Sequence, residues 1–117
     1  MTDTPIIECV PNFSEGRRPE IVAALTSRID SIPKVRVVAS EMDPDHNRSV
    51  ITMIGDPEAV SEAIVDACEF AISTIDMNLQ SGVHPRIGAV DVIPLIPISG
   101  VTVDQSIIVA KRIGTRL

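Results

Sequence analysis

The sequence predicts a mixed α/β fold, of the class called α+β, built around one hydrophobic core. Apolar residues recur about every two positions in some segments and about every 3.6 in others, which are the periods of strands and helices. Proline, glycine and acidic residues separate these segments where turns and helix caps are expected. The chain has 117 residues, of which 44% are hydrophobic. This is enough for one domain with its own core.

The first third of the chain predicts a strand, a helix and a second strand. Pro5–Phe13 is rich in Ile and Val and forms the first strand, and Asn12–Arg18 continues it as a polar loop. Pro19 suits the first turn of a helix that runs to about Ile32. The apolar face of that helix consists of Ile21, Val22, Leu25 and Ile29. Lys34–Ala39 alternates with the period of a strand.

The middle of the chain predicts a loop, a strand and a second helix. Glu41–Asn47 is acidic and contains a proline, which indicates a loop, and Arg48–Ile54 follows as the third strand, with Gly55 at its end. Asp56 is an acidic cap followed by a proline and a glutamate, a typical helix start. We expect this helix to end between Asp76 and Leu79. Its apolar residues are Val60, Ala63, Ile64, Ala67, Ala71 and Ile75.

A fourth strand and a last helix complete the chain. The strand is expected over Ala89–Ile98 and contains Pro94 and Pro97. Because proline cannot donate to a neighbouring strand, this strand belongs at a sheet edge or is bulged. Thr102 and Gln105 fit a capping box that opens the helix.

The resulting element order, β-α-β-β-α-β with an additional C-terminal helix, is that of the ferredoxin-like plait. Right-handed crossovers place the first and third strands centrally and the fourth at an edge. Residues 1–117 contain no repeat, linker or second domain. Enzymes, ligand-binding modules and RNA-binding domains share this fold, so it does not decide the function.

Composition excludes several function classes. The net charge is −6 and aromatic residues are 2% of the chain, which argues against a nucleic-acid surface with its basic stripe and stacking aromatics. No apolar run approaches the ~20 residues of a membrane span, and the N-terminus lacks signal-peptide features. Cys9 and Cys68 lack metal-type spacing and are expected to be buried, reduced thiols. The cytoplasm is therefore the expected location.

The segment Gly82–Gly88, with the sequence Gly-Val-His-Pro-Arg-Ile-Gly, contains the strongest candidate for chemistry. His84 is one of only two histidines, and histidine exchanges its proton near neutrality. Pro85 disfavours helical backbone at His84 and so restricts where the imidazole points. Arg86 is a fixed cation suited to bidentate recognition of a carboxylate. The alternative is a surface turn with solvated charges.

The acidic loop is the second candidate. Glu41, Asp43 or Asp45 would orient His84 and stabilise its protonated form if both loops lie at one end of the sheet. The alternative is that the Asp43-Pro44-Asp45 stretch is a turn whose aspartates bond their own backbone.

Two further groups of polar residues have weaker signals. Asn12 and Ser14 would hydrogen-bond a ligand, or cap the next helix and build the turn. Imidazole and carboxylate groups suit zinc, but the metal-binding motifs HExxH and CxxC are missing. We therefore expect no metal.

Three blocks of the sequence resemble the glutamate formimidoyltransferase (formiminotransferase) family. They are Glu8–Gly16 (ECVPNFSEG), Asn47–Val50 (NRSV) and Gly82–Pro94 (GVHPRIGAVDVIP). The resemblance runs in order through nearly all of the chain. In that family this region is the N-terminal lobe of a two-lobed transferase domain of ferredoxin-like character.

The resemblance implies transfer of a formimidoyl group, or in some relatives a formyl group, between a tetrahydrofolate and L-glutamate, as in histidine breakdown. The family's catalytic histidine falls on His84, as general base toward the attacking amine and then acid toward the leaving nitrogen. Arg48 and Arg86 are expected to recognise carboxylates, and Asn12 the folate or the transferred group. The tetrahydrofolate derivative is a substrate.

Family members continue well beyond the last helix, through the rest of this lobe and a second lobe. The chain is therefore expected to be an incomplete lobe that acts with a second lobe or partner subunit, or else a shortened relative. The alternative function is a non-catalytic ferredoxin-like module that binds a small acid or a protein partner. An unprotected edge strand and the apolar last helix would also support homo-oligomers.

Overall fold

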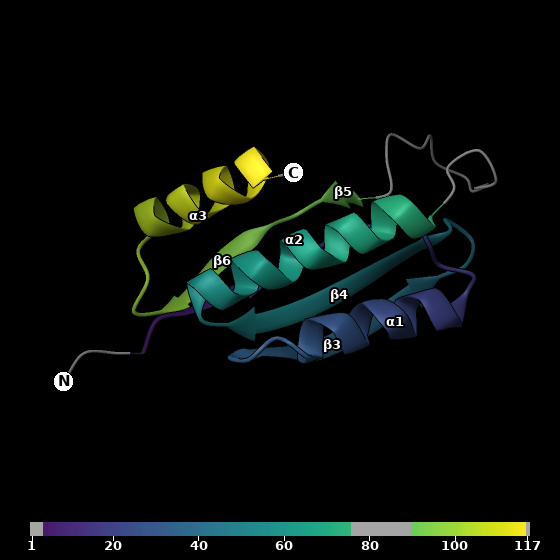
Figure 1. Ribbon diagram of the computed structural model, residues 1–117, viewed down its shortest axis with the longest axis horizontal. Coiled ribbons are helices and arrows are strands. Elements are labelled where there is room, and N and C mark those ends of the chain that lie inside the picture. Colours follow the sequence, from purple (N-terminus) through teal and green to yellow (C-terminus); the bar gives the residue numbers. More distant parts are fainter. Residues whose placement is uncertain (1–3, 76–89, 117) are drawn as a thin grey trace.

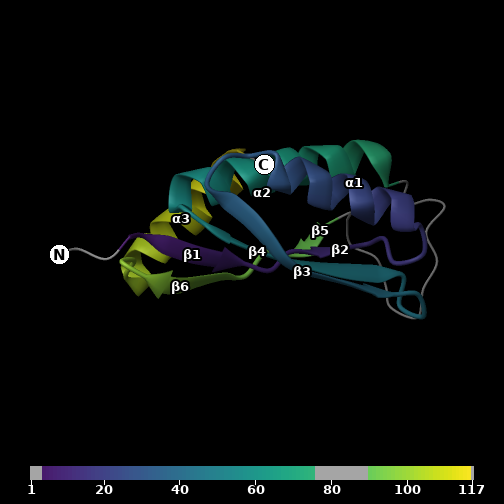
Figure 2. The same ribbon diagram turned by 90° about the horizontal axis from the view of Figure 1, so that it is seen from below.

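Helices cover one face of an antiparallel sheet in the computed structural model, which describes residues 4–75 and 90–116. Helices α1 (Pro19–Asp30) and α2 (Pro57–Thr74) lie side by side over the sheet (Figures 1 and 2). Helix α3 (Val103–Arg116) packs against α2 and against strand β6 (Leu95–Ser99). No helix in the described ranges lies over the opposite face, which we call the open face.

The described part of the sheet has six strands in the order β5-β2-β4-β1-β6, with β3 pairing with the other side of β4. Their bounds are β1 Ile6–Cys9, β2 Asn12–Phe13, β3 Val35–Asp43, β4 Arg48–Gly55 and β5 Val90–Val92. Strands β1 and β2 are two halves of the predicted first strand, interrupted at Val10 and Pro11. Strands β5 and β6 are likewise two halves of the predicted last strand.

When these halves are joined, the sheet has the order of the predicted ferredoxin-like plait. The first and third strands of the prediction are central, and the last strand lies at an edge. The two prolines fit this position. Pro94 lies between β5 and β6, and Pro97 faces Ile7 on β1, the one strand that β6 pairs with in the described sheet. The predicted fold class and edge strand are confirmed.

Capping residues define where the helices begin. The Asp56 carboxylate accepts the Ala59 amide at 3.2 Å and caps α2. The predicted capping box of α3 is confirmed, because the Thr102 hydroxyl accepts the Gln105 amide at 3.1 Å and the Gln105 side chain accepts the Thr102 amide at 2.8 Å. These bonds satisfy amides that have no partner within a helix.

Both predicted helix ends are too late. Helix α1 ends at Asp30 rather than Ile32, because a residue that precedes a proline, here Pro33, is disfavoured in helical conformation. Helix α2 ends at Thr74, and the backbone of Ile75 is already extended with ψ of 111°. The interval predicted for that end, 76–79, lies outside the described residues.

The predicted acidic loop is also wrong in its extent. Glu41 and Asp43 belong to β3, and only residues 44–47 form the turn to β4. The pairing with β4 continues to Asp43 opposite Arg48, with a register shift between Val37 and Ala39. The strand is longer than its apolar pattern predicts because its polar end is held by backbone pairing to β4.

The core lies between the sheet and the helices and is almost entirely aliphatic. Its fully buried side chains include Ile7, Phe13, Leu25, Ile51 and Ile64.

Cys9 and Cys68 are buried in this core as free thiols, as predicted. Burial raises the pKa of Cys9 to about 12 and that of Cys68 to about 11. Since the thiolate is the reactive form, neither cysteine is a nucleophile at neutral pH.

Candidate functional site

Strand β2 is the meeting point of the three sequence blocks singled out above. Asn12 pairs with Val50 on one side and with Val92 on the other, and Phe13 pairs with Ser49 and Val90. The first block therefore lies between the second block and the described end of the third. Positions up to 80 residues apart in the chain, Asn12 and Val92, become neighbours in one sheet.

Four of the predicted site residues share the open face at this end of the sheet. Side chains directly opposite in an antiparallel pair point to the same face. Ile51 and Met53 are buried beneath the helices, so the alternate β4 positions Arg48 and Val50 face the other way. Asn12 and Glu41 both pair with Val50, and Asp43 pairs with Arg48. Diagonal neighbours such as Asn12 and Arg48 are typically ~7–8 Å apart.

Asn12 is half-buried on the β2 side of this group. Its side-chain Nδ2 donates to the Val10 carbonyl at 3.4 Å, a long and weak contact. Arg48 is half-buried as well, whereas Glu41 and Asp45 are exposed. The open face therefore presents an amide and a guanidinium that are partly shielded from solvent, with carboxylates at their rim.

Asp43 binds a different histidine from the one that the sequence suggested. Its Oδ2 lies 2.6 Å from Nδ1 of His46, and its Oδ1 accepts the His46 amide at 3.2 Å. These contacts, the amide first and the ring second, hold the pKa of Asp43 below its usual value. The alternative interpretation of this aspartate as a turn-building residue is therefore supported by the structure.

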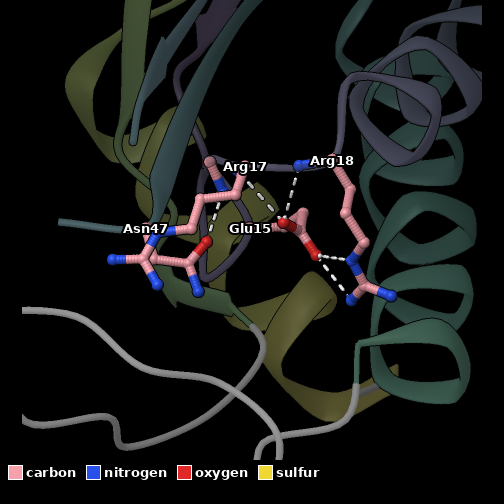
Figure 3. Close-up of polar contacts among 5 residues, drawn as sticks. Glu15, Arg17, Arg18 and Asn47 are labelled. Carbon is pink, nitrogen blue, oxygen red and sulfur yellow. Dashed lines mark hydrogen bonds and ion pairs between the residues drawn. The ribbon is translucent and has the colours of Figure 1, made fainter. Parts of the chain in front are cut away.

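Glu15 is a buried carboxylate that sequence reasoning missed. It is 1% exposed, and Figure 3 shows its contacts: one oxygen accepts the amides of Arg17 and Arg18 at 3.1 and 3.0 Å, and the other accepts Nε of Arg18 at 2.6 Å. Burial acts to raise the pKa of Glu15, but the hydrogen bonds from Arg18 and the two amides prevail and lower it. The sequence signal that could have indicated this cluster is a glutamate followed two positions later by a pair of arginines.

Asn47 joins the loop after β2 to the turn before β4. The Gly16 amide donates to Oδ1 of Asn47 at 2.9 Å (Figure 3), and Nε of Arg17 donates to the Pro44 carbonyl at 2.7 Å. Asn47 is 3% exposed and has a left-handed backbone with φ of 50°. The sequence predicted it in the acidic loop and in the NRSV block, but nothing local indicates a partner 31 positions away.

His84 and Arg86 lie outside the described residues. The described residues that flank their segment are Ile75, which is buried in the core, and Val90, which pairs with Phe13.

Within residues 4–75 and 90–116 there is no group of three or more His, Cys, Asp or Glu side chains placed to hold a metal ion. No helix in those ranges is both long and apolar enough to cross a membrane.

Residues 6–117 match the family model of the formiminotransferase domain, N-terminal subdomain. The match covers nearly the whole chain and includes the three blocks that meet at β2. The chain belongs to the formiminotransferase family.

Curated relatives of this chain are longer proteins. It is 42% identical over 112 residues to the formimidoyltransferase-cyclodeaminase of Rattus norvegicus, covering 96% of this chain and 21% of that protein. It is 38% identical to the glutamate formimidoyltransferase of Streptococcus pyogenes and 40% identical to that of Thermoplasma acidophilum, covering 38% and 37% of their lengths. The chain thus spans between a fifth and two fifths of the relatives that it matches.

Proposed function

We propose that this chain supplies the N-terminal lobe of an enzyme that moves a formimidoyl or formyl group between tetrahydrofolate and L-glutamate in the cytoplasm. The names of the relatives support the reaction class. The observation that carries the proposal for this chain is the convergence of its three family blocks on β2, which groups Asn12 and Arg48 on the open face.

In the proposed reaction His84 acts as general base and then as general acid. It takes the proton from the attacking nitrogen while the new C–N bond forms to the formimidoyl carbon. It then returns a proton to the leaving nitrogen while the old C–N bond breaks, so the imidazole is regenerated. Histidine suits both steps because its pKa lies near the working pH.

The binding roles follow from side-chain chemistry. Arg48 and Arg86 bind carboxylates of glutamate and folate, because a guanidinium forms paired hydrogen bonds with a carboxylate. Asn12 hydrogen-bonds the folate or the transferred group.

Among the candidate orienting carboxylates, we favour Glu41. It lies on β3 and pairs with Val50, whose other partner is Asn12, so it shares the open face with Asn12 and Arg48. The Asp43 carboxylate is occupied by His46, and Asp45 lies in the turn after β3 rather than in the sheet.

The proposed activity needs protein from outside residues 1–117, either a second lobe or a partner subunit. The relatives are at least twice as long as the matched region, and the open face has no covering helix among the described elements.

The test joins this chain to the downstream portion of the Streptococcus pyogenes relative and measures transfer from formimidoyl-glutamate to tetrahydrofolate. His84→Ala should lower kcat by ~10²-fold or more, the usual loss for a general acid–base group. The control is Ser73→Ala on the exposed side of α2, which should leave the rate unchanged. If His84→Ala leaves transfer unchanged, the role is wrong. If calorimetry shows a small acid binding to a fusion that performs no transfer, the non-catalytic module is favoured instead.

A further inference from the structure

The loop after β2 and the β3–β4 turn contact each other through more than one kind of interaction. The buried bond from the Gly16 amide to Asn47 Oδ1 is 2.9 Å long, and the Arg17 guanidinium reaches the Pro44 carbonyl at 2.7 Å. Because one bond is buried and the other is exposed, the buried bond to Asn47 has less competition from water.

Gly16 allows the two backbones to touch. A Cβ atom at this position would collide with the backbone amide and carbonyl of Arg48 and with the carbonyl of Asp43. The loop therefore lies directly on the strand ends that carry Arg48 and Asp43, and no side chain separates them.

Asn47 combines two properties that few residues have together. Its φ of 50° lies in the left-handed region, which Asn, Asp and Gly tolerate better than other residues. Its side chain also supplies the acceptor for Gly16 from a buried position. Glycine would keep the backbone and lose the acceptor, whereas aspartate would keep both.

Glu15 stiffens the loop side of this contact. Both of its oxygens are engaged by groups of Arg17 and Arg18, so the carboxylate holds the loop in shape rather than offering itself to a ligand. The Gly16 amide is thereby presented to Asn47 by a rigid segment.

We propose that Asn47 is a positioning residue that fixes Asn12 and Arg48 relative to each other through the Gly16 amide. Asn12 lies on β2, just before the loop that contains Gly16, and Arg48 directly follows Asn47. The two side chains are diagonal neighbours on the open face. The effect on catalysis rests on the proposed function, in which these two residues bind the acidic substrates.

The experiment compares Asn47→Gly with Asn47→Asp. Circular dichroism first checks that each variant folds. In the fused transferase, Asn47→Gly should raise the KM for formimidoyl-glutamate about five- to tenfold, which corresponds to the free energy of one hydrogen bond. Its kcat should stay within about twofold of that of the unmodified fusion. Asn47→Asp should raise the KM less than Asn47→Gly does, because it retains the acceptor for Gly16, although it loses the amide donor and buries a charge.

A second readout needs no activity. Hydrogen exchange at the Gly16 amide should accelerate in Asn47→Gly, and the side-chain NMR signals of Asn12 and Arg48 should shift together. Asn47→Asp should accelerate exchange at Gly16 less than Asn47→Gly does, because it retains the acceptor. If Gly16 exchanges faster while the Asn12 and Arg48 signals stay in place, Asn47 is only structural and the proposal is wrong.

The two proposals fail in different ways. An unmodified fusion that performs no transfer contradicts the proposed function, and the NMR comparison still decides whether Asn47 positions the pair. Normal transfer with an unchanged KM in Asn47→Gly contradicts the positioning role alone.

Discussion

Asp43 and His46 form an ion-pair-type contact within the β3–β4 turn, with Oδ2 of the aspartate 2.6 Å from Nδ1 of the imidazole. The same carboxylate accepts the His46 amide, so it closes the turn through both backbone and side chain. This turn ends at Asn47, and β4 begins at the next residue, Arg48. The local pairing of Asp43 therefore contributes to the geometry of the proposed binding face.

The first prediction concerns the pH dependence of this turn. The pKa of Asp43 is lowered in the folded protein, so its contribution to stability is present above the unfolded-state pKa of about 3.9 and is lost as the pH falls through the lower folded-state value. Asp43→Asn should reduce the free energy of unfolding by more at pH 6 than near pH 2. Urea unfolding at both pH values measures this, with the exposed Asp45→Asn as control. An equal loss at both pH values would contradict the ionic origin.

The second prediction concerns the buried carboxylate of Glu15. Glu15→Gln keeps the shape but replaces charge-assisted bonds to Arg18 and two amides, so it should lower the free energy of unfolding by about 2 kcal/mol at pH 7. The half-exposed position of Arg18 limits the ion-pair part of this loss.

The lowered pKa of Glu15 gives the pH window for this effect. Its contribution is fully present above the unfolded-state pKa of about 4.3 and disappears as the pH falls through the folded-state value. Glu20→Gln, an exposed glutamate in the first turn of α1, is the matched control and should cost about 0.5 kcal/mol or less. Comparable losses for the two variants would show that burial of Glu15 contributes nothing.

The third prediction concerns the left-handed backbone of Lys34. Its φ of 71° lies in the left-handed region. Its carbonyl accepts the Asp56 amide at 3.1 Å and lies so close to Gly55 that a Cβ atom there would collide with it. A lysine in this conformation costs roughly 1–2 kcal/mol. Lys34→Gly should therefore be more stable than Lys34→Ala by about 1 kcal/mol, although both remove the same charge. Thermal unfolding of the two variants checks this, and equal stabilities would mean that the backbone is unstrained.

The order of the elements could be predicted because it depends on local patterns. Period-two segments, the Asp56 cap and the Thr102–Gln105 box each predict their own element, and the prolines of the last strand predict its edge position. The length of β3 depends on its partner β4, so the strand character of Glu41 and Asp43 left no local signal. The contacts of Gly16 with Asn47 and of Arg17 with Pro44 join segments far apart in the chain. No periodicity in either segment indicates them.

The last prediction concerns two buried hydroxyls. Ser49 and Ser61 are 1% and 2% exposed, and in the part of the chain that the structure describes neither Oγ has a hydrogen-bond partner. Burying a hydroxyl without a partner costs roughly 1–3 kcal/mol. Ser49→Ala and Ser61→Ala should therefore each raise the free energy of unfolding by about 1 kcal/mol.

Exposed serines of the same elements or their neighbours isolate the effect of burial. Ser27→Ala, at an exposed position of α1, measures the gain from helix propensity and should be subtracted from the Ser61 result. Ser40→Ala, on exposed β3, is the control for Ser49. A loss of stability in Ser49→Ala would mean that its hydroxyl bonds a group outside the described residues. Ser49 pairs with Phe13, which also pairs with Val90, the described flank of the His84 segment. A Ser49→Ala fusion that is more stable yet slower in transfer would show that this serine is retained for the reaction.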